Sequence, residues 1–347
     1  MSLKKVFENE EIEASAPCRI DMGGTIDIST FYYYLKDLNP CTFNIALDLR
    51  TTVSIHPYKK GMVKVSSIGF ESTEFPLKSV PFDHPLGLIF AVCSYFQISG
   101  VHINIKSLSP PRSGLGGSSV AAVALISAFF KALSKIYFSY PSKEKIALMA
   151  YNLESSVAGV PCGIQDQLAA VYGGVNAWYF LGEMDEPMFY RKSIGKKQMA
   201  AALEKRIIVA YCGIPHESKD INGTWVRQFK EGKNRDIWID IVKLTIEFVE
   251  SLAQKDFQSA ANAMNKETAL RRKMTPDVFY PIGEELVESA IKNNCGARFT
   301  GAGGGGCLWA LGEPESINKL NTVWENILSK EKDAFILKTK IDLDGVK

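Results

Sequence analysis

The chain has 347 residues, of which 46% are hydrophobic and 22% are charged. This length suits one large core or two ordinary ones, and it slightly favours two domains. The net charge of +2 comes from 40 basic and 38 acidic residues, so we expect neither nucleic acid nor a membrane as a partner. No long apolar stretch is free of charge and the N-terminus is polar, which predicts a cytoplasmic protein.

Cysteine and histidine usage limits the kinds of metal site. The seven cysteines never form a C-x-x-C pair, and no two of the four histidines stand at helical spacing. These patterns argue against a disulfide framework, a structural zinc site and a histidine-built metal centre. We therefore expect any metal to be held by carboxylates and hydroxyls.

The first half of the chain begins with strands and continues with helices. Short β-branched runs predict strands at 51–56, 63–68 and 101–105. Between 118 and 137 the apolar residues cover nearly every direction of a helix, which predicts a buried core helix. Two further helices and a strand are then predicted, at 142–157, 164–171 and 175–181.

A polar region at 182–197 separates the two halves and predicts a boundary between domains at 1–190 and 191–347. The second half contains a strand, three amphipathic helices, a strand–glycine–strand unit and a late strand, at 206–212, 237–253, 258–271, 284–293, 297–311 and 335–341. Strands and helices mix in both halves without regular alternation. This organisation predicts two α+β domains.

A glycine-rich turn at 110–119, with the sequence PPRSGLGGSS, leads from a predicted strand into the buried helix. Its glycines let backbone N–H groups approach an anion, and the helix N-terminus behind them supplies free donors and a partial positive charge. This combination suits a di- or triphosphate, although the spacing fits neither the Walker loop nor the dinucleotide fingerprint. The alternative interpretation is a flexible loop capped by Ser118.

Two acids lie on either side of a tight Pro/Gly turn. Glu154 stands one turn before its helix ends, and Asp166 stands in the first turn of the next helix, where the helix dipole favours its ionised form. The turn can direct both carboxylates into one cleft. Phosphoryl transfer needs such a pair, one to orient the accepting hydroxyl and one to hold Mg²⁺. The alternative interpretation is a surface acid and a helix-capping acid.

Two further segments carry weaker signals. The run 301–306 has apolar, strand-like flanks, which predicts an interior turn that something approaches closely. Arg19 and Asp27 lie at the end of an early strand and resemble an ordinary surface pair when considered alone.

Taken together and in this order, the segments resemble the GHMP kinases, the superfamily of galactokinase, homoserine kinase, mevalonate kinase and phosphomevalonate kinase. The resemblance implies a first domain like domain 2 of ribosomal protein S5, a ferredoxin-like second domain and ATP bound between them with Mg²⁺. It is strongest to heptose 7-phosphate kinases and galactokinase-like sugar kinases, although residues 23–27 depart from the galactokinase pattern. The implied acceptor is therefore the anomeric hydroxyl of a heptose 7-phosphate or a related sugar.

The resemblance also implies site residues. Asp166 and Arg19 are the catalytic pair, and Ser118 and Glu154 hold the metal. The remaining contacts fall into two sets. The residues that bind ATP are Pro110, Ser113, Gly114, Leu115, Gly116, Gly117, Ser118 and Ser119. The residues that bind the sugar are Gly24, Thr25, Asp27, Asp166, Gly303 and Gly304.

Several alternatives stay open at this point. If the sugar already carries a phosphate, candidate cations lie at Lys219, Arg227, Arg271 and Arg272. A sensor that binds ATP and sugar without chemistry is a rival, as is a kinase of a non-sugar alcohol. Oligomeric state is expected to be a monomer or a homodimer.

Overall fold

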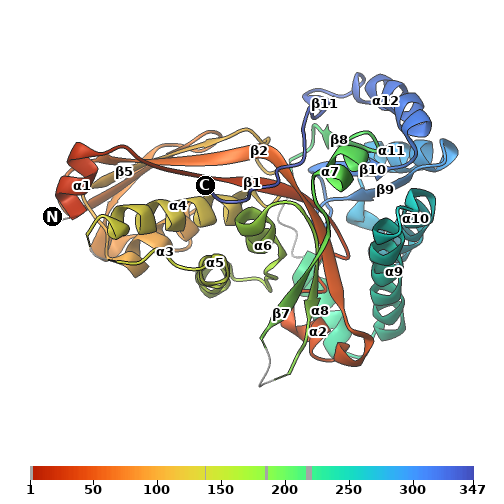
Figure 1. Ribbon diagram of the computed structural model, residues 1–347, viewed down its shortest axis with the longest axis horizontal. Coiled ribbons are helices and arrows are strands. Elements are labelled where there is room, and N and C mark those ends of the chain that lie inside the picture. The colour runs from red at the N-terminus through yellow and green to blue at the C-terminus, as the bar shows by residue number, and fades with distance from the viewer. Residues whose placement is uncertain (1–2, 137, 184–186, 216–220) are drawn as a thin grey trace.

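The computed structural model describes residues 3–136, 138–183, 187–215 and 221–347. These residues form two sheets that lie side by side (Figure 1). The first has seven strands in the order β4-β3-β5-β2-β6-β7, with β1 paired to β2, and the second has four strands in the order β11-β8-β10-β9. Helices accompany both sheets, so the predicted pair of α+β domains is confirmed.

The first domain surrounds two long antiparallel strands. Its strands are β1 (Ile12–Met22), β2 (Cys41–Pro57), β3 (Met62–Ser67), β4 (Thr73–Pro76), β5 (Val101–Ser107), β6 (Val175–Phe180) and β7 (Phe189–Gly195). Its helices are α1 (Leu3–Asn9), α2 (Ser29–Tyr32), α3 (Gly87–Phe96), α4 (Gly117–Ser134), α5 (Lys143–Val157) and α6 (Gln165–Tyr172). Figure 1 shows α3, α4, α5 and α6 on one side of the long strands.

Helix α4 is the buried core helix that the sequence predicts. It is long and apolar enough to cross a membrane by composition, but 67% of it is buried inside the protein. It contacts β1, β2, α3, α5 and α6, which accounts for apolar residues all around its surface. The following helix, α5, begins as predicted at Ser142, whose hydroxyl accepts a hydrogen bond from the backbone N–H of Lys145.

The second domain has a ferredoxin-like strand order. Its strands are β8 (Ile207–Cys212), β9 (Gly296–Phe299), β10 (Cys307–Leu311) and β11 (Ala334–Ile336). Its helices are α7 (Lys197–Glu204), α8 (Ile221–Lys230), α9 (Arg235–Ala253), α10 (Phe257–Met274), α11 (Pro281–Lys292) and α12 (Pro314–Leu328). All neighbouring strands are antiparallel, and numbering them along the domain gives the order 4-1-3-2.

The chain crosses between the domains later than predicted. The polar region at 182–197 contains β7, which pairs with β6 as far as Gly195, so the predicted boundary at residue 190 falls inside a strand. Only Phe189 and Ile194 are buried in β7, which leaves no apolar alternation for a sequence pattern to detect.

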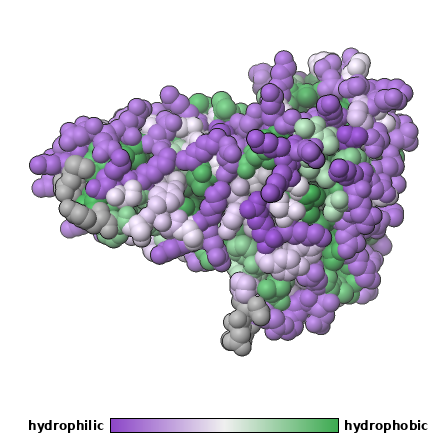
Figure 2. Space-filling view, in the orientation of Figure 1, coloured by the Kyte–Doolittle hydropathy of each residue, from purple (hydrophilic) through white to green (hydrophobic). Residues whose placement is uncertain are grey.

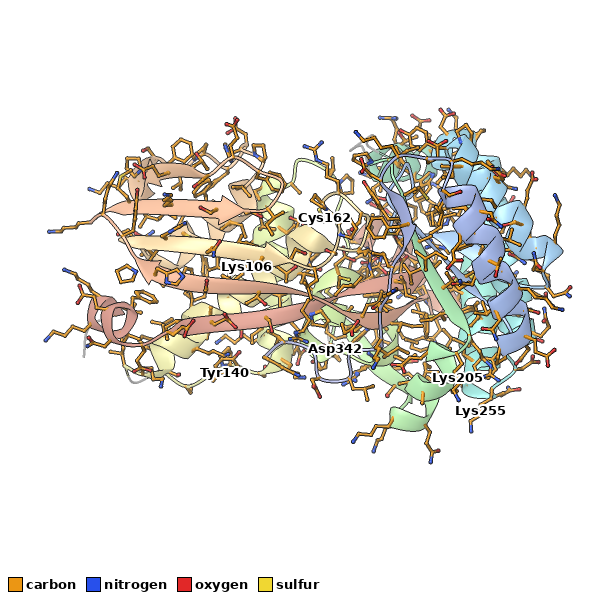
Figure 3. All side chains as sticks on the ribbon, turned by 90° about the horizontal axis from the view of Figure 1, so that it is seen from above. Lys106, Tyr140, Cys162, Lys205, Lys255 and Asp342 are labelled. Atoms are coloured by element: carbon orange, nitrogen blue, oxygen red, sulfur yellow. The ribbon has the colours of Figure 1, made fainter. Side chains whose placement is uncertain are left out.

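The final residues return to the first domain. The predicted late strand at 335–341 pairs with β8 only over Ala334–Ile336. The backbone then runs along the first sheet, where Asp48 N–H donates to the carbonyl of Lys340 and Ser15 pairs with Lys347 in both directions. Figure 3 shows Asp342 where this tail crosses the long strands.

The two hydrophobic cores exchange residues across the domain interface. Phe248 and Trp309 of the second domain belong to the first core, whereas Ile26, Ile28 and Phe31 of the first domain belong to the second core. Hydrophilic residues cover most of the surface visible in Figure 2. The interlocked cores hold the two domains in one arrangement. The segment after β1, with Ile26, Ile28 and Phe31, is part of this interlocked interface.

Phe31 makes the key contact of this interlocked interface, because its ring stacks 3.9 Å from Trp238 and meets Phe229 edge-on at 5.2 Å. We expect Phe31→Ala to lower the free energy of unfolding by about 3–5 kcal/mol, since it leaves a cavity between the domains. Chemical denaturation measures this loss. The matched control is Tyr34→Ala, because Tyr34 is 78% exposed and its replacement should change stability by less than about 0.5 kcal/mol. Equal losses in the two variants would contradict the role of Phe31.

Candidate active site

The four segments that the sequence predicts to form the site meet at one cavity of about 460 Å³. Arg19, Asp27, Glu154, Asp166 and Gly301 all line it, together with most of the loop 110–119. They come from β1, the turn after it, α5, α6 and the turn between β9 and β10. The fold therefore brings together residues that are up to 282 positions apart, from Arg19 to Gly301.

The glycine-rich loop connects β5 to α4. Gly114 and Gly116 have positive φ angles of 72° and 81°, which disfavour residues with a side chain. A Cβ at Gly116 would also lie 2.9 Å from Oδ2 of Asp166. No side-chain cap bond is present at the start of α4 in the described structure, so the alternative of a turn capped by Ser118 is not supported. The free N–H groups of this helix end suit an anion.

The other predicted members of the loop occupy different environments. Gly117 and Ser118 are exposed, and Ser119 is buried. Leu115 does not line the cavity, because its side chain is buried in the first core. Its carbonyl instead accepts a hydrogen bond from the backbone N–H of Arg19.

Arg19 and Asp166 form the predicted pair. Two guanidinium nitrogens of Arg19 lie 2.8 and 2.7 Å from Oδ1 of Asp166, and a third donates to the carbonyl of Gly114 at 2.6 Å. Arg19 is only 3% exposed, whereas the side chain of Asp166 is 22% exposed. Arg19 thus connects the acid to the glycine-rich loop, and the acid keeps access to the cavity.

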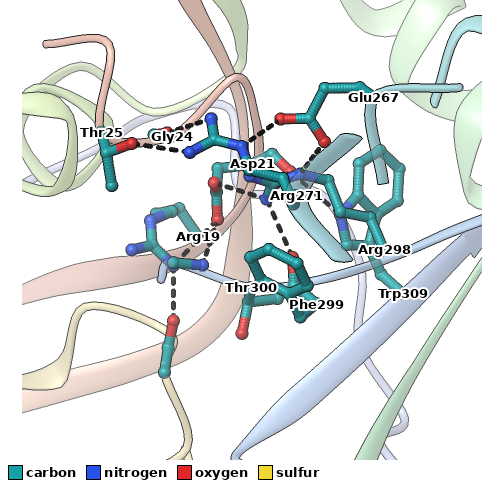
Figure 4. Close-up of polar contacts among 12 residues, drawn as sticks. Arg19, Asp21, Gly24, Thr25, Glu267, Arg271, Arg298, Phe299, Thr300 and Trp309 are labelled. Atoms are coloured by element: carbon teal, nitrogen blue, oxygen red, sulfur yellow. Dashed lines mark hydrogen bonds and ion pairs between the residues drawn. The ribbon is translucent and has the colours of Figure 1, made fainter. Parts of the chain in front are cut away.

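Asp21 extends this pair into the second domain (Figure 4). Its Oδ1 accepts the backbone N–H of Gly301 at 2.7 Å and lies 3.4 Å from Arg19, while its Oδ2 accepts from Arg298 at 2.9 Å. Arg298 also pairs with Glu267 at 3.1 Å. The sequence interpretation missed Asp21, although an acid two residues from Arg19 in a strand points to the same face of the sheet.

Glu267 leads onward to Arg271, which holds the turn after β1. Glu267 and Arg271 pair at 2.8 Å, and both are fully buried. The guanidinium of Arg271 donates to the Thr25 hydroxyl at 2.9 Å and to the carbonyl of Gly24 at 2.8 Å. Thr25 has a φ of 76°, which is rare for a β-branched residue, and the Arg271 contact stabilises it there.

The predicted sugar-binding residues divide into two groups. Thr25, Asp27 and Asp166 line the cavity. Gly24, Gly303 and Gly304 do not line it in the described structure, so their predicted sugar contacts are not supported.

Other contacts account for these glycines. Gly24 presents its carbonyl to Arg271. A Cβ at Gly303 would lie 2.5 Å from Val278, and the N–H of Gly304 donates to the carbonyl of the same residue.

The glycine run at 301–306 has a different close partner. A Cβ at Gly306 would lie 2.5 Å from the carbonyl oxygen of Ser113, and the N–H of Cys307 donates to that oxygen at 2.8 Å. The close approach that the sequence predicted at this run is therefore made by the glycine-rich loop 110–119. The run positions the loop from the second domain.

Burial raises the pKa of each acid in the cavity. It raises the pKa of Glu154 to about 7, although hydrogen bonds from Ser119 and Gln167 oppose the shift. It raises the pKa of Asp27 to about 6. The pKa of Asp166 is also raised by burial despite the opposing charge of Arg19, so its net shift is opposite in direction to the one that the sequence interpretation expected.

Of the four candidate cations for a second phosphate, the three that the structure describes do not line the cavity. Arg271 is fully buried in its contacts with Glu267, and Arg272 pairs with Glu284. Arg227 donates to Thr224 on its own helix. Lys219 lies outside the described residues.

Arg112, Gln165 and Asn222 are among the lining residues that the predicted site did not include. Arg112 lies inside the glycine-rich loop and adds a cation to the cavity. Gln165 precedes Asp166, and its N–H donates to Oδ2 of Asp27 at 2.9 Å. Asn222 reaches the cavity from α8, and no sequence pattern distinguishes it from other polar residues of an amphipathic helix.

Comparisons with known proteins identify relatives over most of the chain. Two family models match, the GHMP kinases N terminal domain over residues 84–174 and the GHMP kinases C terminal over residues 248–326. D-glycero-alpha-D-manno-heptose 7-phosphate kinase of Campylobacter jejuni is 29% identical over 206 residues, which cover 59% of each chain. Mevalonate kinase of Pyrococcus furiosus is 25% identical over 77% of this chain and 81% of that protein.

A solved structure supports the fold over the whole chain. Galactokinase of Lactococcus lactis, crystallised with galactose, has a TM-score of 0.74 at 17% identity. The match covers 99% of this chain and 97% of that one. Both domains therefore share their arrangement with that enzyme.

The shifted pKa of Glu154 predicts a pH-dependent stability. Between about pH 4.5 and 7 the folded protein keeps a proton on Glu154 that the unfolded chain has released, so this residue lowers stability as the pH rises. In the absence of metal and nucleotide, we expect Glu154→Gln to raise the Tm at pH 8 and to change it little below pH 4.5. Thermal unfolding between pH 4 and 9 measures the difference, and Glu144→Gln, exposed on the same helix, should show no such gain. A lower Tm for Glu154→Gln at pH 8 would contradict the raised pKa.

Arg298 is fully buried between Asp21 and Glu267. We expect Arg298→Met to cost about 3–5 kcal/mol of unfolding free energy, because it leaves two buried carboxylates without this partner. Chemical denaturation tests the loss against Lys330→Met. That control breaks an exposed pair with Glu285 and should cost less than about 1 kcal/mol. A loss as small as that of the control would show that the buried ion pairs of Arg298 with Asp21 and Glu267 do not stabilise the fold.

Proposed function

The chain belongs to the GHMP kinases, and from this premise we propose that it transfers the γ-phosphoryl group of ATP to a hydroxyl of a sugar. The observation that carries the proposal is the contact of Arg19 with both Asp166 and the loop at Gly114. This arrangement puts a carboxylate beside an anion-binding loop in one cavity. Phosphoryl transfer depends on such positioning and charge stabilisation.

The roles of the site residues follow from this arrangement. The loop 113–119 binds the phosphates of ATP through backbone N–H groups. Asp166 accepts the hydrogen bond of the attacking hydroxyl, and its raised pKa favours proton acceptance. As the hydroxyl oxygen bonds to the γ-phosphorus, its proton passes to Asp166 and the bond to the bridging oxygen of ADP breaks. Arg19 stabilises the charge on Asp166 and on the transferring group.

The residues around Glu154 fit a magnesium ion. Glu154 is a cavity-lining carboxylate with hydroxyl neighbours, and Mg²⁺ takes one or two carboxylates together with substrate phosphates and water. The pKa of about 7 indicates a carboxylate that lacks a compensating cation. When bound, Mg²⁺ neutralises charge on the phosphates, and Glu154 with Ser118 would hold it. Ser119 already donates its hydroxyl hydrogen to Glu154 at 2.6 Å.

For the acceptor, we propose the anomeric hydroxyl of a heptose 7-phosphate or a related sugar. A heptose 7-phosphate kinase is among the similar proteins, and the cavity holds the buried acid Asp27 beside Gln165. Galactose is a second sugar candidate, because the fold matches that of a galactokinase. A non-sugar alcohol such as mevalonate remains a candidate of another kind, since a mevalonate kinase matches 77% of the chain.

A substrate panel tests the proposal. The protein is incubated with ATP, Mg²⁺ and either hexoses, 7-phosphorylated heptoses or mevalonate, and ADP release is measured. Locating the new phosphate by NMR then identifies the acceptor hydroxyl. ADP release with mevalonate alone would overturn the choice of a sugar, and binding of ATP and sugar without ADP release would establish a sensor.

Asp166→Asn tests the chemistry. We expect the variant to lose about 10²–10⁴-fold in kcat, because a carboxamide cannot accept the proton, while ATP binding stays close to that of the wild type. Steady-state ADP release and calorimetric titration of a non-hydrolysable ATP analogue measure the two quantities. Asp240→Asn removes an exposed acid on α9 and is the control. Full activity of Asp166→Asn would remove this residue from the mechanism.

A further inference from the structure

Three residues that line the active-site cavity each carry a buried side-chain oxygen for which the described residues provide no hydrogen-bond partner. These oxygens are Oδ1 of Asp27, Oε1 of Gln165 and Oδ1 of Asn222. A buried acceptor that loses its water without gaining a donor costs free energy, so such atoms are rare in folded proteins. Their occurrence around one cavity indicates a ligand that brings several donors.

These oxygens come from both domains. Asp27 and Gln165 are neighbours in the first domain, joined by the 2.9 Å hydrogen bond from the Gln165 backbone. Asn222 lies in the first turn of α8, in the second domain. A ligand that satisfies all of them must touch both domains.

The position of Asn222 is fixed by the contacts that fix the turn after β1. Trp225, three residues further along α8, packs against the guanidinium of Arg271 at 4.8 Å. The same guanidinium binds Thr25 and Gly24. Phe31 packs against Phe229 of α8 as well. The turn that carries Asp27 and the helix that carries Asn222 are therefore held together by shared contacts.

The chemistry of these groups selects the ligand. Ionised phosphates offer only acceptors, so they do not satisfy buried acceptor oxygens. A hydroxyl both donates and accepts, and it suits a carboxylate as well as an amide. Several hydroxyls on one rigid ring can reach acceptors on opposite walls. The set is thus complementary to a polyhydroxylated ligand.

We propose that Asn222 determines specificity for the sugar. Its side-chain oxygen accepts a hydrogen bond from a sugar hydroxyl other than the one that is phosphorylated. Asp27 and Gln165 bind further hydroxyls from the opposite domain. This inference rests on the proposed sugar kinase activity and assigns to α8 a part in choosing the sugar. A site built to bind a hydroxyl strongly disfavours an analogue that lacks it, because the protein group stays unpaired.

The test compares the best sugar substrate with its monodeoxy analogues. For wild type, we expect the analogue that lacks the hydroxyl bound by Asn222 to lose at least about ten-fold in kcat/KM. In Asn222→Ala this preference should fall to about two-fold or less, because the partner oxygen has been removed. Preferences for the other hydroxyls and the KM for ATP should stay within about two-fold of wild type.

Two further variants separate this effect from a general one. Asn222→Asp keeps an acceptor oxygen on the same side chain length and should retain the preference. Asn262→Ala removes an exposed asparagine on α10 and should behave as wild type. Thermal unfolding of each variant shows whether the fold is intact.

The outcomes distinguish the two proposals. If none of the sugars causes the wild-type protein to release ADP, the proposed function fails and this inference fails with it. If wild type phosphorylates a sugar but Asn222→Ala keeps every preference, this inference alone is overturned. Loss of the preference in both Asn222→Ala and Asn222→Asp would overturn the assignment of Asn222 as an acceptor. Loss in Asn222→Ala alone supports it.

Discussion

A continuous chain of buried charges is the constraint on which the two-domain site depends. The charges alternate in sign. Asp21 lies between Arg19 and Arg298, and Glu267 lies between Arg298 and Arg271. The members of the chain in order are Asp166, Arg19, Asp21, Arg298, Glu267 and Arg271. Burying single charges is costly, whereas partners placed at every step offset that cost. The arrangement is only complete when both domains are docked, because the links between Asp21 and Arg298 cross the interface.

This dependence means that the site geometry belongs to neither domain alone. The glycine-rich loop extends from the first domain, but Gly306 and Cys307 of the second domain hold its Ser113 carbonyl. The turn that carries Asp27 also extends from the first domain, but Arg271 holds its strained Thr25. The acid, the glycine-rich loop and the turn that carries Asp27 are therefore aligned by the second domain. The interlocked cores make this alignment rigid.

Much of the fold could be predicted from the sequence, because hydrophobic periodicity reports local burial. The helix at 118–137 and the cap at Ser142 are examples, since a nearly all-apolar helix and a serine before a helix each have a direct physical meaning. The strand β7 could not be predicted, because its side chains are mostly exposed. Asp21 and Asn222 could not be predicted, because their surroundings are formed by residues distant in sequence. Asp21 pairs with Arg298, and Asn222 lines the cavity. The glycines at 303 and 304 do not line the cavity of the described residues. A glycine-rich run indicates close approach without identifying the partner, which is Val278 for Gly303.

The return of the final residues to the first sheet has a consequence for folding during synthesis. Arg50, in the middle of β2, binds Asp342 and the carbonyls of Ser15 and Gly345. Two of these partners, Asp342 and Gly345, are synthesised only after the whole second domain, whose last strand ends at Ile336. The first domain thus leaves the ribosome early but is completed last. At the edge beside β1, the backbone N–H of Ser15 receives its acceptor, the carbonyl of Lys347, only when that residue has been synthesised. A stalled or truncated nascent chain would expose this unfinished edge to other chains, which is a recognised route to aggregation.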